Sequence, residues 1–282
     1  MNLENTIKKA SKVLKDNNIV SYALDAQVIL SNIMGVEKEY LITNNEMNIS
    51  EKIIEKYDIA IKRRIKKEPV AYIIGKREFW SEDFIVSNKT LVPRPETELL
   101  IYKIIEFFKG KKINILDIGT GCGCILLSML KELPMARGTG IDISSKAIKI
   151  AKLNAENLKL KNRSKFKIND LNKYSVGNYD LIVSNPPYIL SKDLKSLSKD
   201  IINYEPRIAL DGGLDGLDLI KKVIYKSKIL LKKNGLFALE IGYNQYNKVS
   251  SILKFNKFRI IKKVYDYKHN VRCIISTKMD FY

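Results

Sequence analysis

The chain has 282 residues and a mass of 32.4 kDa, which is enough for one large core or two unequal ones. Hydrophobic residues make up 45% of it, which is typical of a globular protein, and no uncharged apolar run is long enough for a membrane span. The net charge of +19 comes mostly from lysines along the whole length, so it leaves nucleic acid open as a partner without favouring it.

Residues 1–75 are predicted to form a small helical domain, because their apolar residues recur at helical spacing. Ser50 is the expected N-cap of the third helix, and Pro69 would end that helix. Residues 76–93 form the expected hairpin linker. Their polarity alternates as in two strands, around a turn expected at Ser87 and Asn88.

Residues 94–282 are predicted to form an α/β domain with a doubly wound, mostly parallel sheet, because buried strands alternate with helices. The expected strands are residues 113–119, 138–144, 165–170, 179–184 and 235–242. The expected helices among them are residues 123–133, 144–160 and 217–231. Residues 259–267 and 271–278 would form a final hairpin that adds an antiparallel strand at the sheet edge.

Cysteine and histidine usage argues against disulfides and metal. The chain has three cysteines, an odd number, and Cys122 and Cys124 are too close in sequence for a disulfide framework or a CxxC zinc knuckle. The single histidine, His269, leaves no basis for a site built from several histidines. The first residues also lack an apolar signal core. We therefore expect reduced thiols in the cytoplasm, no membrane association and no bound metal.

The first predicted strand of the sheet runs into a glycine-rich loop, Asp117-Ile118-Gly119-Thr120-Gly121-Cys122-Gly123. Glycines at a strand-to-helix turn let the backbone approach a ligand closely. The spacing is G-x-G-x-G, so the G-x-G-x-x-G phosphate fingerprint of dinucleotide folds is incomplete. Asp117 is badly placed for an anionic pyrophosphate but suits the ammonium group of a methionine moiety. The loop therefore favours S-adenosylmethionine over a dinucleotide as the cofactor.

Polar residues also stand at the ends of the next three strands. Asp142 ends the second strand, where a carboxylate can accept hydrogen bonds from both hydroxyls of a ribose. Asp170 ends the third strand, near the place expected for an adenine amine, and Asn185 ends the fourth. Because open α/β sheets bind ligands at the carboxyl ends of their strands, we expect these residues to meet at one crevice.

The fourth strand ends in Asn185-Pro186-Pro187-Tyr188. The nitrogen of an amide or aromatic amine is a poor nucleophile, because its lone pair is delocalised. The side-chain oxygen of Asn185 and the backbone carbonyl of Pro186 could accept both N–H hydrogens and turn the lone pair toward a methyl group. The prolines keep the loop rigid and remove competing donors, and Tyr188 offers a flat face to a planar acceptor. Positioning can supply most of the catalysis, so no strong base is required.

Six motifs, in order, resemble the PrmC/HemK family, the glutamine methyltransferases of peptide-chain release factors. They are LVPRPETE at residues 91–98, ILDIGTGCGC, GIDIS, IVSNPPYI, NYEPRIALDGGLDGL at residues 203–217, and HNVR near the end. The resemblance spans essentially the whole chain and implies a Rossmann-like class I methyltransferase fold. It also implies methyl transfer from S-adenosylmethionine to the side-chain amide of the glutamine in a Gly-Gly-Gln loop.

The resemblance further implies which residues touch the cofactor and the substrate. It places cofactor contacts along residues 119–123, at Asp142, after Asp170 and at Asn185, and it places the substrate at residues 185–188. Leu171 departs from the pattern, because some members carry an aromatic residue beside the adenine; apolar contact is still available there. Residues 1–75 contain no cofactor element, so we expect the helical domain to recognise the protein substrate.

Three alternatives remain open. Adenine amines in nucleic acid are methylated through the same Asn-Pro-Pro-Tyr motif, but the chain has no separate target-recognition domain. A related enzyme acts on a glutamine of a ribosomal protein; the segment RPETE at residues 94–98 resembles the release-factor branch better. A non-enzymatic cofactor sensor is disfavoured, because the motif at residues 185–188 is complete. The expected partners are therefore release factors, without an obligatory nucleic acid.

Overall fold

The computed structural model describes residues 1–279, so residues 280–282 of the expected α/β domain lie outside the described part. The chain divides into two compact units. The helical unit comprises residues 1–76 and 198–204, and the sheet unit comprises residues 77–197 and the described residues from 205 onward. Within residues 1–279, none of the helices has the length and apolar character needed to cross a membrane. In the same residues, no group of three or more His, Cys, Asp or Glu side chains could hold a metal ion.

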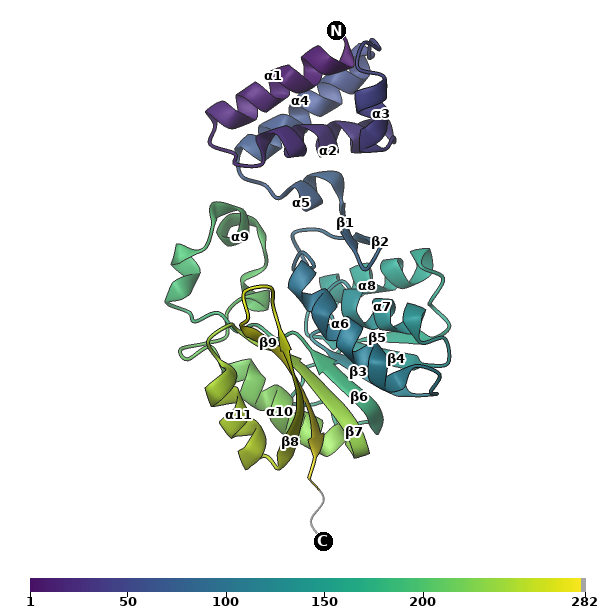
Figure 1. The fold of residues 1–282 in the computed structure, drawn as a ribbon, viewed down its shortest axis with the longest axis vertical. Coiled ribbons are helices and arrows are strands. Elements are labelled where there is room, and N and C mark those ends of the chain that lie inside the picture. The colour runs from purple at the N-terminus through teal and green to yellow at the C-terminus, as the bar shows by residue number, and fades with distance from the viewer. Residues whose placement is uncertain (280–282) are drawn as a thin grey trace. The chain divides into compact units, whose positions relative to one another are not determined.

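The first part of the helical unit is built from five helices. They are α1 (Leu3–Asp16), α2 (Tyr22–Met34), α3 (Lys38–Thr43), α4 (Glu51–Ile65) and α5 (Val70–Ile74) (Figure 1). Their apolar faces share one core, in which Leu14 and Ile29 are fully buried. The Tyr57 hydroxyl donates to the Ala26 carbonyl at 2.8 Å inside this core, so the buried polar group is satisfied.

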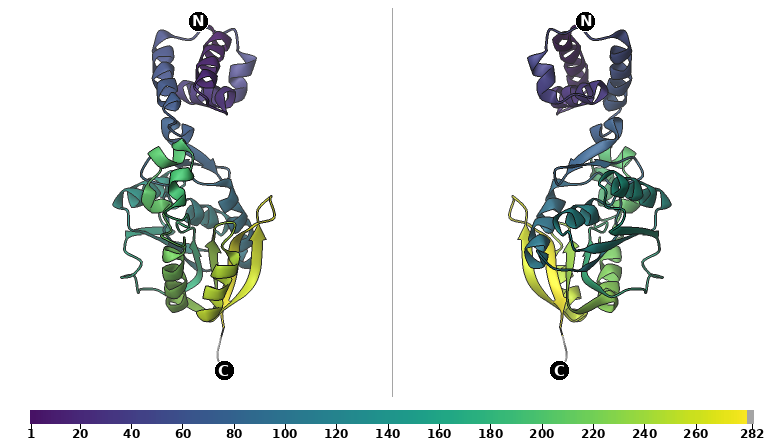
Figure 2. Two further views of the ribbon diagram at one scale, coloured as in Figure 1. Left: turned by 90° about the vertical axis from the view of Figure 1, so that its left-hand side faces the viewer. Right: turned by 90° about the vertical axis from the view of Figure 1, so that its right-hand side faces the viewer.

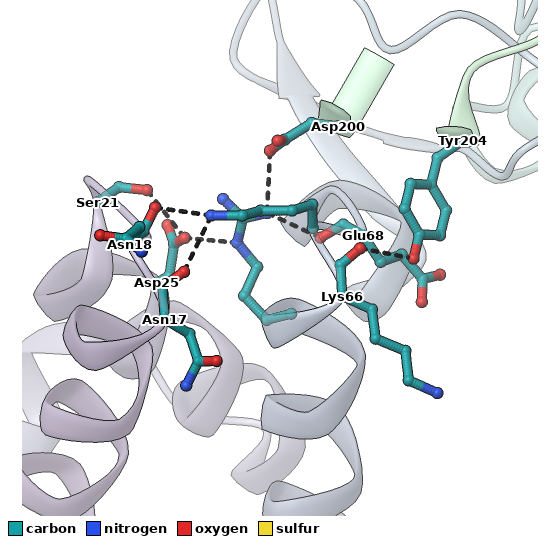
Figure 3. A network of polar contacts seen from close by, with 10 residues as sticks. Asn17, Asn18, Ser21, Asp25, Lys66, Glu68, Asp200 and Tyr204 are labelled. Carbon is teal, nitrogen blue, oxygen red and sulfur yellow. Dashed lines mark hydrogen bonds and ion pairs between the residues drawn. The ribbon is translucent and has the colours of Figure 1, made fainter. Parts of the chain in front are cut away.

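The helical unit also contains α9 (Lys199–Tyr204), which comes from the second half of the chain. Arg64 connects α9 to the other helices: its Nε donates to Asp25 at 2.7 Å, and its Nη1 donates to Asp200 at 2.9 Å. Figure 3 labels these two carboxylate partners, Asp25 and Asp200. Arg64 and Asp200 are 136 positions apart. Local sequence patterns give no indication of such a pair, because only the tertiary fold brings its partners together.

Arg64→Met is expected to lower the free energy of unfolding by about 3–5 kcal/mol, because it leaves the buried Asp25 carboxylate without its cation. The side chains of Arg64 and Asp25 are each only 9% exposed. Urea unfolding followed by far-UV circular dichroism measures the loss. Lys8→Met is the matched control, because Lys8 pairs with Glu4 on the surface and the pair is worth at most about 1 kcal/mol. If the two variants proved equally stable, the ion pair would have no such role.

The sheet unit holds a seven-stranded sheet in the order β5-β4-β3-β6-β7-β9-β8 (Figure 1). The strands are β3 (Asn114–Ile118), β4 (Arg137–Asp142), β5 (Ser164–Ile168), β6 (Tyr179–Ser184), β7 (Leu231–Glu240), β8 (Phe258–Tyr265) and β9 (Val271–Lys278). The first five strands in the spatial order pair in parallel, whereas β9 is antiparallel to both β7 and β8. The predicted doubly wound, mostly parallel sheet is confirmed, and the final hairpin lies at its edge.

Helices cover both faces of this sheet (Figures 1 and 2). One face carries α6 (Pro95–Phe108), α7 (Cys124–Glu132) and α8 (Ser145–Asn157), and the other carries α10 (Asp218–Leu230) and α11 (Tyr246–Phe255). Successive strand residues point to opposite faces, so Ile115 packs with the first set of helices and Leu116 with the second. Burial on both faces explains why the central strands β6 and β7 contain apolar runs, at residues 181–183 and 236–239, whereas the edge strand β5 carries exposed lysines.

The linker forms a hairpin, but its expected turn position is wrong. The strands are β1 (Lys76–Phe79) and β2 (Glu82–Ile85). The turn between them lies at Trp80 and Ser81, both with positive φ (54° and 57°), whereas Ser87 and Asn88 follow the second strand. A two-residue hairpin turn requires positive φ, which Trp-Ser does not suggest. A contact from another element supports the turn: the Trp80 backbone N–H donates to Glu98 at 2.8 Å.

Candidate active site

The predicted polar residues lie together along the carboxyl edge of the parallel strands. Asp117 lies in β3, Asp142 ends β4, and Asn185 directly follows β6. Asp170 lies two positions beyond the end of β5. Because β5, β4, β3 and β6 are neighbours in that order, their ends bring these residues to one side of the sheet unit.

A cavity of about 310 Å³ opens at these strand ends. The predicted residues that line it are Gly119, Gly121, Asp142, Asp170, Leu171, Asn185 and Pro187. The predicted residues that do not line it are Asp117, Thr120, Cys122, Gly123, Pro186 and Tyr188. Each residue of the second group lies within two positions of a lining residue along the chain.

The glycine-rich loop forms one wall of the cavity. Gly119 and Gly121 have φ values of 73° and 56°, a conformation that other residues rarely adopt. The N–H groups of Gly119 and Thr120 both donate to the Ile141 carbonyl, at 2.9 and 3.0 Å. The loop is thus bound to β4. The cavity wall there is backbone, which lets a ligand approach closely.

Gly123 and Cys122 support the loop at the start of α7. Gly123 has a φ of 84° and precedes the helix, and an added Cβ would lie 3.2 Å from the Leu127 side chain. The Cys122 carbonyl accepts a hydrogen bond from Asn154 Nδ2 at 2.9 Å, and the Cys122 side chain is buried. Both residues are therefore structural parts of the loop.

Asp117 is fully buried beside the loop. Its Oδ2 accepts a hydrogen bond from the Thr120 hydroxyl at 2.6 Å, whereas its Oδ1 is buried without a partner. Burial, with a smaller contribution from the neighbouring Asp142, raises the pKa of Asp117 to about 7, although the hydrogen bond from Thr120 acts in the opposite direction. A buried carboxylate with an unsatisfied oxygen is a position where a cationic group would be stabilised.

Asp142 both lines the cavity and supports the loop. Its Oδ2 accepts the Gly121 N–H at 3.0 Å, and its Oδ1 accepts the Ser144 N–H at 2.8 Å. Burial raises its pKa, and these backbone hydrogen bonds act in the opposite direction. Each carboxylate oxygen has a second lone pair, so both can still accept a hydroxyl hydrogen from a ligand.

The segment after β5 also lines the cavity. Asp170 Oδ1 accepts the Asn172 N–H at 2.8 Å, and Leu171 is 8% exposed within the apolar cluster of α10. Asn169, which was not predicted, lines the cavity with a buried Oδ1 that has no partner. Its place beside Asp170 at the same strand end is the signal that could have identified it.

Three side chains hold the Asn185–Tyr188 segment. Asn185 Nδ2 donates to Thr97 Oγ1 at 3.3 Å, and Gln245 Nε2 donates to the Tyr188 carbonyl at 3.0 Å. Arg272 donates to the Tyr188 hydroxyl at 3.0 Å, and its guanidinium carbon lies 5.5 Å from the centre of the Tyr188 ring. Arg272 therefore lies against the Tyr188 ring, which also packs on the apolar cluster of α10 and α11.

Several residues around the site were missed by the sequence reasoning. Glu205 holds the segment before α6: its carboxylate accepts from Arg94 at 2.6 Å and from the Val92 N–H at 3.4 Å. Pro206 and Ile208 follow it and line the cavity. Val92 and Arg94 lie in the motif at residues 91–98, and Glu205, Pro206 and Ile208 lie in the motif at residues 203–217. The sequence revealed both motifs but not the contact between them.

The site fits S-adenosylmethionine. Two buried oxygens without partners, Asp117 Oδ1 and Asn169 Oδ1, are acceptors that suit an ammonium group and an amine. Asp142 presents two further acceptors to a diol, and Leu171 presents an apolar wall. These acceptors and the apolar wall therefore suit a ligand with a methionine end, a ribose and an adenine.

The fold and the site together define a Rossmann-like methyltransferase. A methyltransferase from Pyrococcus furiosus has a similar fold, with a TM-score of 0.52, 18% identity, and coverage of 69% of this chain and 87% of that chain. The hMettl16 catalytic domain, solved with an RNA hairpin, gives a TM-score of 0.56 and 15% identity over 82% of this chain and 83% of that chain. At these identities the likeness concerns the fold alone.

Sequence comparison then identifies the family. Residues 5–75 match the PrmC N-terminal domain and residues 94–214 match the methyltransferase small domain. The release factor glutamine methyltransferase of Clostridium acetobutylicum is 36% identical over 99% of both chains. That of Buchnera aphidicola subsp. Schizaphis graminum is 39% identical over 99% of this chain and all of its own. The chain belongs to the release factor glutamine methyltransferase family, which confirms the resemblance seen in its motifs.

Proposed function

We propose that this protein transfers a methyl group from S-adenosylmethionine to the side-chain amide nitrogen of the glutamine in the Gly-Gly-Gln loop of peptide-chain release factors. The observation that carries the proposal is Asn185, which lines the cavity at the end of β6 and begins a complete Asn-Pro-Pro-Tyr motif. The relatives that match over nearly the whole chain support the choice of substrate. Because release factors act on ribosomes, the proposal places the reaction in the cytoplasm.

The cofactor would be held along the carboxyl edge of the sheet. Gly119 and Gly121 would lie against it through their backbone, Asp142 would accept from the ribose hydroxyls, and Asp117 would face the ammonium group. Asp170 would approach the adenine from the segment after β5. When bound, S-adenosylmethionine supplies a methyl group that its sulfonium already makes electrophilic.

The chain's own contribution is to orient the acceptor. Asn185 Oδ1 and the Pro186 carbonyl would accept the two N–H hydrogens of the glutamine amide, which turns the nitrogen lone pair out of conjugation. Pro186 and Pro187 have no N–H groups that could compete for these acceptors. Holding the nitrogen in line with the methyl group lowers the barrier without a strong base, and the nitrogen gives up one of its two N–H protons to solvent once it carries the methyl group.

We further propose that the helical unit recognises the release factor. A glutamine in a glycine-rich loop offers little surface, so selecting one protein requires contacts away from the reacting amide. The residues that line the cavity all lie in the sheet unit, between residues 89 and 222. This leaves the surface of the helical unit free for a protein partner.

One experiment separates this function from its rivals. The enzyme is incubated with methyl-labelled cofactor and, separately, release factors, ribosomal proteins and DNA. We expect label only in release factors, on the glutamine of the Gly-Gly-Gln loop, as located by peptide mass spectrometry. Exclusive labelling of a ribosomal protein or of adenine would refute the proposed substrate.

Asp142→Ala is expected to weaken S-adenosylmethionine binding by about 1.5–3 kcal/mol, the size typical of hydrogen bonds to a charged group. The variant should also melt at a lower temperature, because the Gly121 and Ser144 N–H groups lose their acceptor. Calorimetric titration and thermal melts with and without cofactor measure the two effects. Asp180→Ala is the control, because Asp180 accepts the Asn114 N–H at the opposite strand ends. Unchanged cofactor affinity in Asp142→Ala would reduce Asp142 to a structural role.

A further inference from the structure

We propose that Thr97 is a positioning residue that fixes the Asn185 side-chain amide with Oδ1 toward the substrate, by receiving the hydrogen bond from Asn185 Nδ2. This inference rests on the proposed function. It also gives a chemical role to the PETE segment at the start of α6, which has no role in the proposed function.

The direction of the hydrogen bonds carries the argument. The Thr97 hydroxyl donates to Glu240 Oε2 at 2.7 Å, and a hydroxyl has only one hydrogen to give. The Thr97 oxygen can then only accept a hydrogen bond from the neighbouring Asn185, so Asn185 must point its NH₂ group at Thr97. The distance from Asn185 Nδ2 to Thr97 Oγ1 is 3.3 Å. The other end of the amide, Oδ1, is then turned away from Thr97.

Both hydrogen bonds of Thr97 lie inside the protein, where reversing the Asn185 amide would cost free energy. Thr97 is 2% exposed and Glu240 is fully buried. Water therefore cannot replace either partner, and an amide turned the other way would bring its oxygen against the lone pairs of the Thr97 hydroxyl. Asn185 itself is part-buried and lines the cavity, so the fixed amide faces the position of the acceptor.

Glu240 holds both ends of the Asn-Pro-Pro-Tyr segment. Its Oε2 reaches Asn185 through Thr97, and its Oε1 accepts from the Tyr188 hydroxyl at 3.5 Å. Arg272, on β9, lies 3.9 Å from Glu240 and donates to the same hydroxyl at 3.0 Å. One buried carboxylate at the end of β7 thus sets the geometry of the first and last residues of the motif.

The consequence is chemical. If the Asn185 amide were reversed, its NH₂ group would face the NH₂ group of the substrate glutamine, and two donors would meet. The acceptor that draws an N–H hydrogen away from the glutamine nitrogen would be lost. Thr97 therefore acts on the rate of methyl transfer without touching the cofactor or the reacting atoms.

Thr97→Val tests this role, because valine keeps the shape of threonine and removes the hydroxyl. We expect kcat on release factor to fall about tenfold, the value of one oriented hydrogen bond, with unchanged S-adenosylmethionine affinity by calorimetry. Thr97→Ser restores the hydroxyl and should recover most of the lost rate. A Thr97→Val enzyme with the parent kcat, or one that loses cofactor affinity in proportion to rate, would overturn the assignment.

Thr277→Val is the matched control. Thr277 is also a buried threonine, and its hydroxyl donates to the Gly235 carbonyl at 2.9 Å near the far end of β9. The same substitution there removes one hydrogen bond without touching Asn185, so kcat should stay at the parent value. If the parent itself does not methylate release factors, the proposed function fails; if an active parent tolerates Thr97→Val, only the positioning role fails.

The pH dependence of kcat in the parent enzyme gives a second readout, which does not require the Thr97→Val variant to fold. Burial raises the pKa of Glu240 to about 7; Arg272 and Thr97 oppose the shift, and Glu96 adds to it. Tyr188 and Cys273 also face Glu240, but burial raises their own pKa values, so they stay neutral near pH 7. When protonated, Glu240 can donate to Thr97 and free the hydroxyl hydrogen to point at Asn185, which favours the reversed amide.

The parent kcat at saturating cofactor and release factor is therefore expected to fall as the pH is lowered through about 7, and the same step should persist in Thr97→Ser. In Thr97→Val the step should be smaller than in the parent, because no hydroxyl connects Glu240 to Asn185 and only the contact of Glu240 with Tyr188 remains. A parent kcat that is constant between about pH 6 and 8, the range in which a group of this pKa changes charge, would contradict the proposal.

Discussion

Asn185→Ala is expected to lower the rate of release-factor methylation by about 100-fold or more, while S-adenosylmethionine affinity changes little. The expected loss is the size found when one preorganised polar group is removed from an active site. Asn185 lines the cavity, and the hydrogen bond that its side chain makes in the described structure goes to Thr97 rather than to the glycine-rich loop. Its removal should therefore act on the acceptor amide and leave the loop that faces the cofactor in place.

A methylation assay and a calorimetric titration with cofactor measure these two quantities. Asn256→Ala is the matched control, because Asn256 also loses one hydrogen bond, to the Ile252 carbonyl at 2.9 Å, but lies after α11. We expect the control to turn over at the parent rate. Near-normal turnover in Asn185→Ala would remove Asn185 from the chemistry and with it the proposed orientation of the substrate amide.

Intact release factor is expected to have a kcat/KM about 100-fold or more above that of a short peptide carrying Gly-Gly-Gln, which corresponds to roughly 2.7 kcal/mol of binding away from the glutamine. We assign this binding to the helical unit. Steady-state kinetics on the two substrates measure the ratio. Most of the difference should appear in KM, because the reacting amide is the same in both.

The full chain is the right protein for this test, because α9 belongs to the helical unit. Deleting residues 1–75 would remove Arg64, the partner of Asp200, and the Lys66 carbonyl, which accepts from the Tyr204 hydroxyl at 3.0 Å. Hydrogen exchange on the full chain, with a release factor whose target glutamine is replaced, locates the contact instead. Slower exchange in α1, α2 or α4 would support the assignment, and protection confined to the sheet unit would refute it.

The salt dependence of binding, measured with the same full-length proteins, distinguishes a nucleic-acid partner from a protein partner. Binding through several phosphates falls steeply, and linearly in log affinity against log salt concentration. A mixed protein interface responds less to salt. A steep linear loss would thus favour a nucleic-acid target despite the family to which the chain belongs.

The order of elements was predictable because it depends on local rules. Apolar spacing indicates the helices of residues 1–75, and apolar runs between helices, such as residues 181–183 and 236–239, indicate central parallel strands that are buried on both faces. The turn at Trp80 and Ser81 was not predictable in this way. Its positive φ values are supported by contacts from other elements, which the residues at the turn do not reveal.

The residues of the candidate site likewise fall into those that the sequence identified and those that it did not. Gly119 and Gly121 could be identified because only glycine readily adopts their backbone conformation, and Asn185 because prolines end its strand. Asp142 followed from its place at a strand end. Glu240 also stands at the end of a strand, β7, but a single acidic residue in an apolar run does not indicate which side chains it contacts.

The sequence by itself therefore determined the fold class, the cofactor loop and the segment that meets the acceptor, because each is encoded by residues within a few positions of one another. The tertiary structure alone decided that α9 belongs to the helical unit, that Asp117 has an oxygen without a partner, and that Thr97 stands between Asn185 and Glu240. The physical reason is separation along the chain. Asn185 and Thr97 are 88 positions apart, and Thr97 and Glu240 are 143 apart, so only the packing of α6 against the ends of β6 and β7 brings their hydrogen-bonding groups together.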